Sequence, residues 1–474
     1  MRLPRLPLVA LALTLPVLRL AAQAPAAAPT PVPALVPAGG PAPVAPPAIV
    51  TPLPYVSERA LGGLKFTQPV YIIAPPDGTH RLFILEKSGR IYVIPDVTKP
   101  EKKLFLDLSA EVGAPDGDSG LMAIAFHPDF GKNRQFYAWF TRNQSPPGTP
   151  AQTASFSDTL ARFTTSATDP DQADPASEQL IITQFDRAQD HDGGGLAFGS
   201  DGDLYLSLGD EAGQYDKFHN SQLIDKNFFS GILRLDVDQR PGSLKPNPHA
   251  SVQPGTYTIP ADNPFVGATS FNGAPVDPAR VRTEFYAVGL RNPWRISFDP
   301  VTKLLWAADV GQDLFESVDL IRKGGNYGWS YFEGSQPLVP PPNQGRRGGR
   351  GGANAAPTQR IPPAGLTFDQ PLYSYRHTDA GADKCLIGGY VYRGKALPAL
   401  TNHYIFCDYI SGRIWALSPV DGTKDPKVEM IAREKGGGIV VFGQDPVTGD
   451  ILMANFAPFS GYIERLVPAP APKP

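Results

Sequence analysis

A histidine and an aspartate stand at the two ends of one predicted β-hairpin. His191 precedes its first apolar strand, Asp210 follows its second, and Asp201-Gly202 provides a tight turn between the strands. Because the two ends of a hairpin return to the same edge of a sheet, we expect His191 and Asp210 to meet. An imidazole beside an anion that fixes its tautomer can act as a general base. Taken alone, the segment equally allows a solvated loop that carries a histidine.

An arginine and an asparagine precede another predicted strand in the same way. Arg291 and Asn292 stand before the strand that begins at Ile296, a position that matches that of His191 in its own hairpin. A guanidinium placed there suits an electron-rich oxygen or a carboxylate. An arginine that bridges neighbouring sheets is the structural alternative.

Acidic residues occupy related positions elsewhere in the chain. Asp118 corresponds to His191 in an earlier hairpin, whereas His127 lies in a turn at the opposite end and is interpreted as structural. The segment Asp309–Asp319 follows a predicted strand and returns to the end that carries His191. Its carbonyls and carboxylates are the ligands that a hard cation such as Ca²⁺ prefers.

These residues would lie at the same end of the fold if the hairpins around them are copies of one repeated structural unit. An apolar strand, a turn and an apolar or aromatic return strand recur six times. The first strands lie at residues 70–73, 124–126, 196–198, 296–298, 389–392 and 440–442. The repeat predicts an all-β fold, a six-bladed β-propeller of four-stranded antiparallel blades, with a β-sandwich as the alternative. In a propeller, the loops at one end converge on the central channel.

The composition agrees with many short strands joined by turns. The 474 residues include 47 Gly and 53 Pro, and 19% are charged, whereas long runs at helical spacing are scarce. The formal net charge of −3 argues against nucleic acid as a partner, because phosphate binding needs concentrated positive charge.

The N-terminus predicts export. Two arginines, an apolar run over 8–18 and small residues after it are typical of a signal peptide. A membrane anchor is the alternative, but the run falls short of the ~20 residues of a spanning helix. We therefore expect a periplasmic or secreted protein with no membrane span after signal removal. The predicted parts are a signal peptide (1–23), an Ala/Pro-rich linker (24–54), the propeller (55–468) with a low-complexity insertion (336–365), and a Pro-rich tail (469–474).

Cys385 and Cys407 are the two cysteines of the chain. An even count in an exported protein makes a disulfide between them reasonable, and two unrelated buried thiols are the alternative. Their spacing matches no zinc motif.

Four segments together resemble the glucose/sorbosone dehydrogenase family, the soluble aldose dehydrogenases that use pyrroloquinoline quinone (PQQ), and the related propeller of hedgehog-interacting proteins. The resemblance runs from about Leu64 to Leu466. Its motifs are Gly-Leu-Met-Ala-Ile-Ala-Phe-His-Pro-Asp-Phe (120–130), Asp-His-Asp-Gly-Gly (190–194), Gly-Leu-Arg-Asn-Pro-Trp (289–294) and Gly-Gly-Asn-Tyr-Gly-Trp (324–329). It implies a dehydrogenase that oxidises an aldose or related sugar at C1, with an external electron acceptor.

The resemblance also implies catalytic roles for three residues. His191 would remove the proton from the C1 hydroxyl as hydride passes to the quinone. Asp210 would orient His191, and Arg291 would stabilise charge on the quinone oxygen.

Cofactor and metal contacts are implied for five further residues. Asn292 would contact PQQ, and Asp118 and Asp190 fall where the family places polar and acidic residues near the cofactor and substrate. The backbone carbonyls of Gly311 and Gln312 would hold the Ca²⁺ that polarises the quinone.

The chain departs from the family at two places. Gly195 stands where many relatives have Arg. Where the soluble glucose dehydrogenases clamp the PQQ carboxylates with a lysine and two arginines, this chain has Ile410 or Ser411 and the run Gly436–Gly438. The alternatives are therefore a non-catalytic propeller that binds a carbohydrate or a protein, and a hydrolase that uses metal-activated water. The cations that could substitute for this clamp are Arg376, His377, Arg433 and Lys435.

Overall fold

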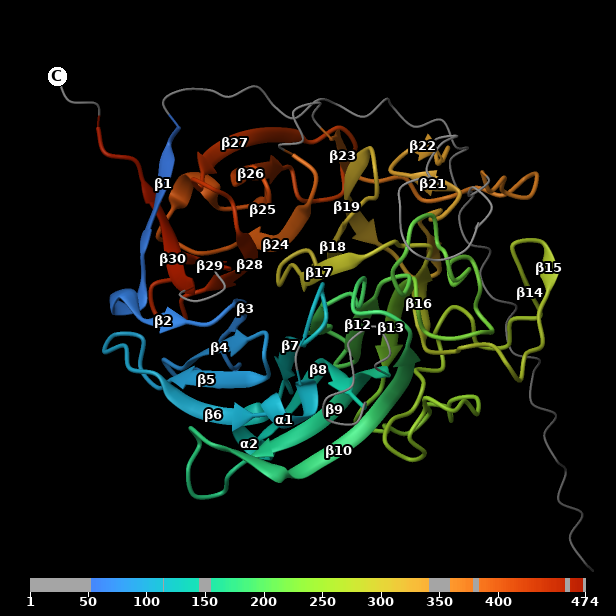
Figure 1. Cartoon of the computed structure of the whole chain (residues 1–474), viewed down its shortest axis with the longest axis horizontal. Helices are drawn as coiled ribbons and strands as arrows, with labels where there is room; N and C mark the ends of the chain where they lie inside the picture. Colours follow the sequence, from blue (N-terminus) through green and yellow to red (C-terminus); the bar gives the residue numbers. More distant parts are fainter. Residues whose placement is uncertain are drawn as a thin grey trace, which may run out of the picture. The chain divides into compact units, whose positions relative to one another are not determined.

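The computed structural model describes residues 53–113, 115–144, 155–340, 359–377, 383–456 and 461–471. All described residues belong to one compact unit. Within it, Figure 1 shows six β-sheets arranged around a common centre. The predicted six-bladed β-propeller with four-stranded antiparallel blades is confirmed.

Each blade is a meander that begins with the strand next to the central channel. The first three are β3 (Pro69–Ile73), β4 (Leu82–Glu86), β5 (Arg90–Ile94) and β6 (Lys103–Asp107); β7 (Leu121–Phe126), β8 (Gln135–Asn143), β9 (Phe156–Thr165) and β10 (Ala173–Asp186); β11 (Leu196–Phe198), β12 (Leu204–Leu208), β13 (Gly231–Leu235) and β16 (Phe285–Val288), to which β20 (Gly325–Asn326) adds in parallel.

The other three blades follow the same plan. They are β17 (Pro293–Phe298), β18 (Leu305–Asp309), β19 (Phe315–Ile321) and β23 (Tyr373–Arg376); β24 (Leu386–Tyr392), β25 (His403–Asp408), β26 (Arg413–Ser418) and β27 (Lys427–Arg433); β28 (Ile439–Gln444), β29 (Ile451–Asn455), β30 (Gly461–Pro468) and β1 (Tyr55–Arg59), with β2 (Lys65–Phe66) also on β30. The described helices are single turns, α1 (Ser109–Val112), α2 (Phe130–Asn133), η1 (Leu61–Gly63) and η4 (Pro398–Leu400). Two small hairpins, β14–β15 (Ser270–Phe271, Ala274–Pro275) and β21–β22 (Phe332–Glu333, Gln336–Pro337), lie in the insertions.

The ring closes through the N-terminal strand of the folded chain. β1 pairs antiparallel with β30, from Tyr55 opposite Pro468 to Arg59 opposite Glu464, and the inner strand β28 of the sixth blade lies beside β3 of the first. The repeat predicts the inner hairpin of the sixth blade, which begins at residues 440–442, but not this outer strand from the N-terminal end of the fold. None of the described helices has the length and apolar character needed to span a bilayer.

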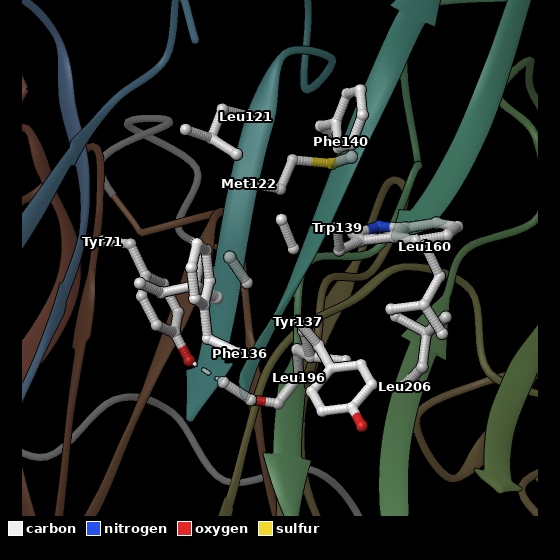
Figure 2. Packing of buried hydrophobic residues seen from close by; sticks show 14 of the residues in the cluster. Tyr71, Leu121, Met122, Phe136, Tyr137, Trp139, Phe140, Leu160, Leu196 and Leu206 are labelled. Carbon is white, nitrogen blue, oxygen red and sulfur yellow. Dashed lines mark hydrogen bonds between the residues drawn. The ribbon is translucent and has the colours of Figure 1, made fainter. Parts of the chain in front are cut away.

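Most strands near the channel are buried on both faces because each blade packs between two others. All six residues of β7 are buried, and Figure 2 shows aromatic and aliphatic side chains of the first three blades in contact. Polar tips of these side chains bond across blades: the Tyr71 hydroxyl donates to the Leu196 carbonyl (3.4 Å), and Trp139 Nε1 donates to the Asp192 carbonyl (3.0 Å). The start of the third blade is thereby fixed to the first two.

The structure also bears on the two cysteines and on the predicted insertion. Cys385 and Cys407 are both unbonded thiols, so the expected disulfide is wrong. Cys407 pairs with Ile387, while Cys385 lies opposite Tyr409, so the cysteines sit diagonally, and diagonal pairs are too widely spaced for a disulfide. Of the predicted insertion 336–365, residues 341–358 lie outside the described residues, and Leu338 is buried against Tyr215 and Trp329.

The β1–β30 pair carries a titrating group. Burial, followed by the negative charge of Glu434, raises the pKa of Glu464 to about 7 from its ordinary value of 4.5. A carboxyl group with a raised pKa favours the folded state only while it is protonated, so its contribution to the free energy of unfolding falls between about pH 4.5 and 7.

We therefore expect Glu464→Gln, which imitates the protonated form, to gain stability relative to the wild type as pH rises from 5 to 8. Urea unfolding at several pH values measures this difference. The control is Glu58→Gln on the same strand pair, because Glu58 is exposed and makes a surface ion pair with Arg465 (2.9 Å). A wild type and Glu464→Gln that keep a constant difference across this pH range would contradict the expectation.

Candidate active site

A cavity of about 360 Å³ opens among the ends of the inner strands. This volume is in the range of small-molecule sites. Its lining combines a polar side with a largely apolar, partly aromatic side. The polar lining comes from Lys87, Asp118, Ser119, Asp190, His191, Arg291 and Asn292, and the apolar lining includes Met122, Trp294, Ile387, Tyr409, Val440 and Phe456.

The predicted meeting of His191 and Asp210 is confirmed. β11 and β12 pair around the Asp201-Gly202 turn, and His191 Nδ1 lies 2.6 Å from Asp210 Oδ1. The close approach requires glycine at the end of β12, because a Cβ on Gly209 would lie 2.1 Å from the His191 carbonyl oxygen. His191 itself has a φ of 60°, a left-handed conformation that costs energy in a non-glycine residue and is found often at functional sites.

Asp210 is fully buried and held from several sides. Trp329 Nε1 donates to its Oδ2 (2.8 Å), and its backbone N–H donates to the Arg291 carbonyl (2.9 Å). Asn220 Nδ2 donates to its carbonyl oxygen (3.0 Å). The carboxylate that orients His191 therefore has both oxygens bonded and little freedom to turn.

Arg291 fixes the tautomer of His191. Its Nη2 lies 3.0 Å from His191 Nε2, and its Nη1 donates to the Val310 carbonyl (2.9 Å). A guanidinium only donates hydrogen bonds, so Nε2 must carry the lone pair and Nδ1 the proton that faces Asp210. This is the tautomer of a base whose lone pair is directed away from the buried aspartate.

Asp309, at the end of β18, holds the backbone of the arginine and asparagine. It accepts hydrogen bonds from the N–H groups of Arg291 (3.0 Å) and Asn292 (2.7 Å). Desolvation raises its pKa to about 7, although these two N–H groups and the Arg291 charge oppose the shift. The sequence places Asp309 in a segment predicted to hold a cation and gives no sign of this supporting role.

Asn292, Asp118 and Asp190 form a hydrogen-bonded chain along the cavity. Asn292 Nδ2 donates to Asp118 Oδ2 (2.8 Å), Asn292 Oδ1 accepts from Gly193 N (3.2 Å), and Asp118 N donates to Asp190 Oδ1 (3.1 Å). Desolvation at the cavity and the charge of Asp118 raise the pKa of Asp190. The structure thus brings together the six predicted side chains His191, Asp210, Arg291, Asn292, Asp118 and Asp190.

Lys87 is a cavity residue that sequence analysis missed. Lys87 follows β4 as Asp210 follows β12. The repeat could therefore have predicted that Lys87 lies at the same end of the channel. Its Nζ donates to the Gly117 carbonyl (2.5 Å), and no carboxylate forms an ion pair with it within the described part of the chain. Desolvation lowers the pKa of Lys87, and the nearby Asp118 and Asp190 oppose this shift.

The two predicted metal ligands lie in the turn after β18. Gly311 lines the cavity, whereas the Gln312 side chain accepts a hydrogen bond from Tyr215 N (2.7 Å). Among the described residues, no hydrogen bond to the carbonyl oxygen of Gly311 or Gln312 is found. Backbone carbonyl oxygens are among the ligands that a hard cation accepts, and of these two residues Gly311 is the one that lines the cavity.

A second cavity of about 410 Å³ adjoins the first and shares Tyr409 and Phe456 with it. The Gly436–Gly438 run, Ile410 and Lys435 line this second cavity. The other candidate cations are engaged elsewhere or exposed: His377 Nε2 binds Glu316 Oε1 (2.7 Å), Arg433 Nε donates to the Ser411 carbonyl (3.1 Å), and Arg376 is exposed. Of these cations, Lys435 alone lies at a described cavity.

Comparison with known proteins identifies related sequences and folds. Residues 66–435 match the family model described as Glucose / Sorbosone dehydrogenase. HIPL1 protein of Arabidopsis thaliana is 30% identical over 384 residues (73% of this chain, 51% of that protein), and Quinoprotein glucose dehydrogenase B of Acinetobacter calcoaceticus is 27% identical over 289 residues (57% and 52%). The chain thus spans about half the length of these curated relatives.

Structural comparison supports the same fold. The PQQ-bound form of Aldose Sugar Dehydrogenase from Streptomyces coelicolor superposes with a TM-score of 0.53 at 17% identity, covering 88% of this chain and 99% of that chain. At this identity the likeness concerns the fold.

The hydrogen bond from Trp329 to Asp210 can be tested separately from the bulk of the indole ring. Trp329→Phe should lower the free energy of unfolding by roughly 1–3 kcal/mol more than Trp306→Phe, because it removes a donor from a buried carboxylate. Trp306 is equally buried, and its Nε1 has no hydrogen-bond partner among the described residues. Equal losses in urea unfolding would contradict a supporting role for Trp329.

Proposed function

Because the chain belongs to the glucose/sorbosone dehydrogenase family, we propose that it is an exported dehydrogenase that oxidises an aldose or related sugar at C1, with PQQ as hydride acceptor and Ca²⁺ as its metal. The observation that carries the proposal is the pair of His191 and buried Asp210, 2.6 Å apart, with Arg291 3.0 Å from the other ring nitrogen. The predicted signal peptide supports export to the periplasm or the outside of the cell.

Oxidation at C1 removes a hydride from carbon and a proton from its hydroxyl, and His191 would take that proton. Its Nε2 carries the lone pair, and the Nδ1 proton is held by Asp210, so the charge that forms on protonation is stabilised by a buried carboxylate. The fixed ring orientation means that little reorganisation is needed during the transfer.

Arg291 must release His191 before the base can act. In the structure the guanidinium donates to the same lone pair that would accept the proton. Its second bond, to the Val310 carbonyl, and its ring contact with Trp329 at 5.6 Å keep it at the cavity. A ligand oxygen that accepts from Arg291 would free Nε2, so binding and activation of the base are coupled.

The cavity residues fit a planar aromatic acid and a hard cation. Flat side chains such as Trp294, Tyr409 and Phe456 form one side, and Lys87 and Arg291 provide positive charge, while Gly311 and Gln312 offer carbonyl oxygens. When bound, PQQ would supply a two-electron acceptor and Ca²⁺ would polarise its quinone carbonyl. An external electron acceptor would then reoxidise the cofactor.

Asp118, Asp190 and Asn292 would bind and position the ligands. Their hydrogen-bonded chain presents carboxylate and amide groups beside His191. Carboxylates bind sugar hydroxyls well because each oxygen accepts a charge-assisted hydrogen bond. The same groups would hold the C1 hydroxyl near Nε2.

The activity itself is tested with the full protein after signal removal, supplied with PQQ and Ca²⁺ and assayed by dye reduction with a panel of sugars. We expect cofactor-dependent dye reduction. Absence of both a cofactor absorbance change and dye reduction with every sugar would overturn the proposal, and carbohydrate binding without either would favour a non-catalytic propeller.

His191→Gln should lower turnover on the order of 10²–10⁴-fold, the usual contribution of a general base, while PQQ binding followed by absorbance changes little. His80→Gln is the control, because His80 is exposed on the first blade. Loss of PQQ binding together with activity would show that His191 is structural.

A further inference from the structure

Three buried aspartates gather at the channel end of the second blade, outside the cavity. Asp158 is on β9, Asp186 ends β10, and Asp192 follows His191 in the loop that leads to β11. One carboxylate oxygen from each lies within 4.8 Å of the others, and all three side chains are fully buried. Neither the proposed dehydrogenase chemistry nor the family motifs use this cluster as a unit.

Each carboxylate has one bonded and one unbonded oxygen. Asp186 Oδ1 accepts from Ala188 N (2.9 Å), and the Thr141 hydroxyl lies 2.8 Å from Asp192 Oδ2 and 3.4 Å from Asp158 Oδ1. The second oxygens, Asp158 Oδ2, Asp186 Oδ2 and Asp192 Oδ1, have no hydrogen-bond donor outside the cluster among the described residues, and Asp186 interacts with both Asp158 and Asp192. Buried polar atoms without partners are costly and call for a bound group.

No positive side chain offsets the cluster. None of the three aspartates forms an ion pair within the described ranges. Outside the cluster, the charged groups that act on Asp158 and Asp192 include Glu211 and Asp118, which are also negative. Glu211 is itself engaged by Arg187 (2.7 Å). The segment 145–154 between β8 and β9, which lies outside the described residues, contains no Lys, Arg or His.

We propose that Asp158, Asp186 and Asp192 form a binding site for a calcium ion. Calcium takes oxygen ligands at about 2.3–2.6 Å, so three carboxylate oxygens that all lie within 4.8 Å of one another can contact a single ion. Magnesium usually keeps several of its waters and is seldom bound by protein ligands alone, so calcium suits this fully buried set better. The Thr141 hydroxyl between two of the carboxylates is a further oxygen at the site.

Such an ion would fix the loop that carries the proposed base. Asp186 and Asp192 stand at the two ends of the segment that contains Asp190 and His191, and both would be tied to Asp158 of β9. Asp192 is already anchored through its carbonyl to Trp139 Nε1. The site is therefore structural for the His191 loop, and its occupancy does not depend on PQQ or on the proposed activity.

Metal analysis of the full protein, prepared with Ca²⁺ and without PQQ, tests the proposal. Asp158→Asn and Asp192→Asn should each carry one Ca²⁺ per chain fewer than the wild type. Asp174→Asn, which removes an exposed carboxylate from β10, should keep the wild-type content. The result is the difference in calcium content per chain between each variant and the wild type. A calcium ion at Gly311 and Gln312 would be present in all of these proteins and does not change that difference.

Thermal unfolding distinguishes a cluster that binds calcium from one in which the three acids share protons. If the cluster binds calcium, a chelator should lower the melting temperature of the wild type, and Asp158→Asn should melt below the wild type in Ca²⁺. If the acids instead share protons, removing one like charge should leave the melting temperature unchanged or raised. Equal calcium in the wild type and both variants, or a wild type that neither contains calcium nor responds to chelator, would overturn the proposal.

Discussion

Closure of the ring between β1 and β30 is the constraint on which the cavity depends. Every blade contributes lining from the same end of its strands, so the polar and apolar sides of the cavity exist only when all six blades are in place. Residues from the six blades in order are Lys87, Met122, His191, Trp294, Ile387 and Val440. Since the last blade takes its outer strand from the N-terminal end of the fold, the first and last folded segments must meet before the site is complete.

Beneath the cavity, buried carboxylates organise the groups that reach it. Asp210 bonds the third blade to Trp329 and to the backbone of Arg291, and Asp309 bonds the end of β18 to the same backbone. Each carboxylate is satisfied by N–H donors, so His191 and Arg291 are held in place where they line the cavity. A polar site that is fixed before the ligand binds requires little reorganisation during reaction.

The repeat made much of this predictable. Once the hairpins are in phase, residues before the first strand and after the second must share one end of the channel, which is why His191, Asp210 and Arg291 could be placed together. The same reasoning extends to Lys87. The repeat does not predict the position of Trp329. This residue lies in an insertion, which has no fixed place in the repeat, and its indole nitrogen donates to Asp210.

Two other features depend on pairings between distant strands. β1 is separated from β30 by the whole propeller, and its short polar sequence carries no sign of its partner. The aspartate cluster joins β9, the end of β10 and a loop, three segments whose spacing in sequence matches no metal motif. The disulfide prediction failed for the opposite reason: the strands do pair, but with the two cysteines offset by two residues.

The glycine at position 195 is explained by the blade that follows. A Cβ there would lie 2.6 Å from Ile296 Cγ1 and 2.8 Å from the Ile296 backbone nitrogen, so the position has no room for a side chain. The guanidinium of Arg295 instead reaches this loop from β17, donating to the carbonyls of Gly194 (2.9 Å) and Val70 (2.7 Å). Burial lowers the pKa of Arg295 to about 10, so this arginine remains positively charged at neutral pH. The loop that carries Gly195 is thus held by a cation from the neighbouring blade, which bonds to the loop backbone directly.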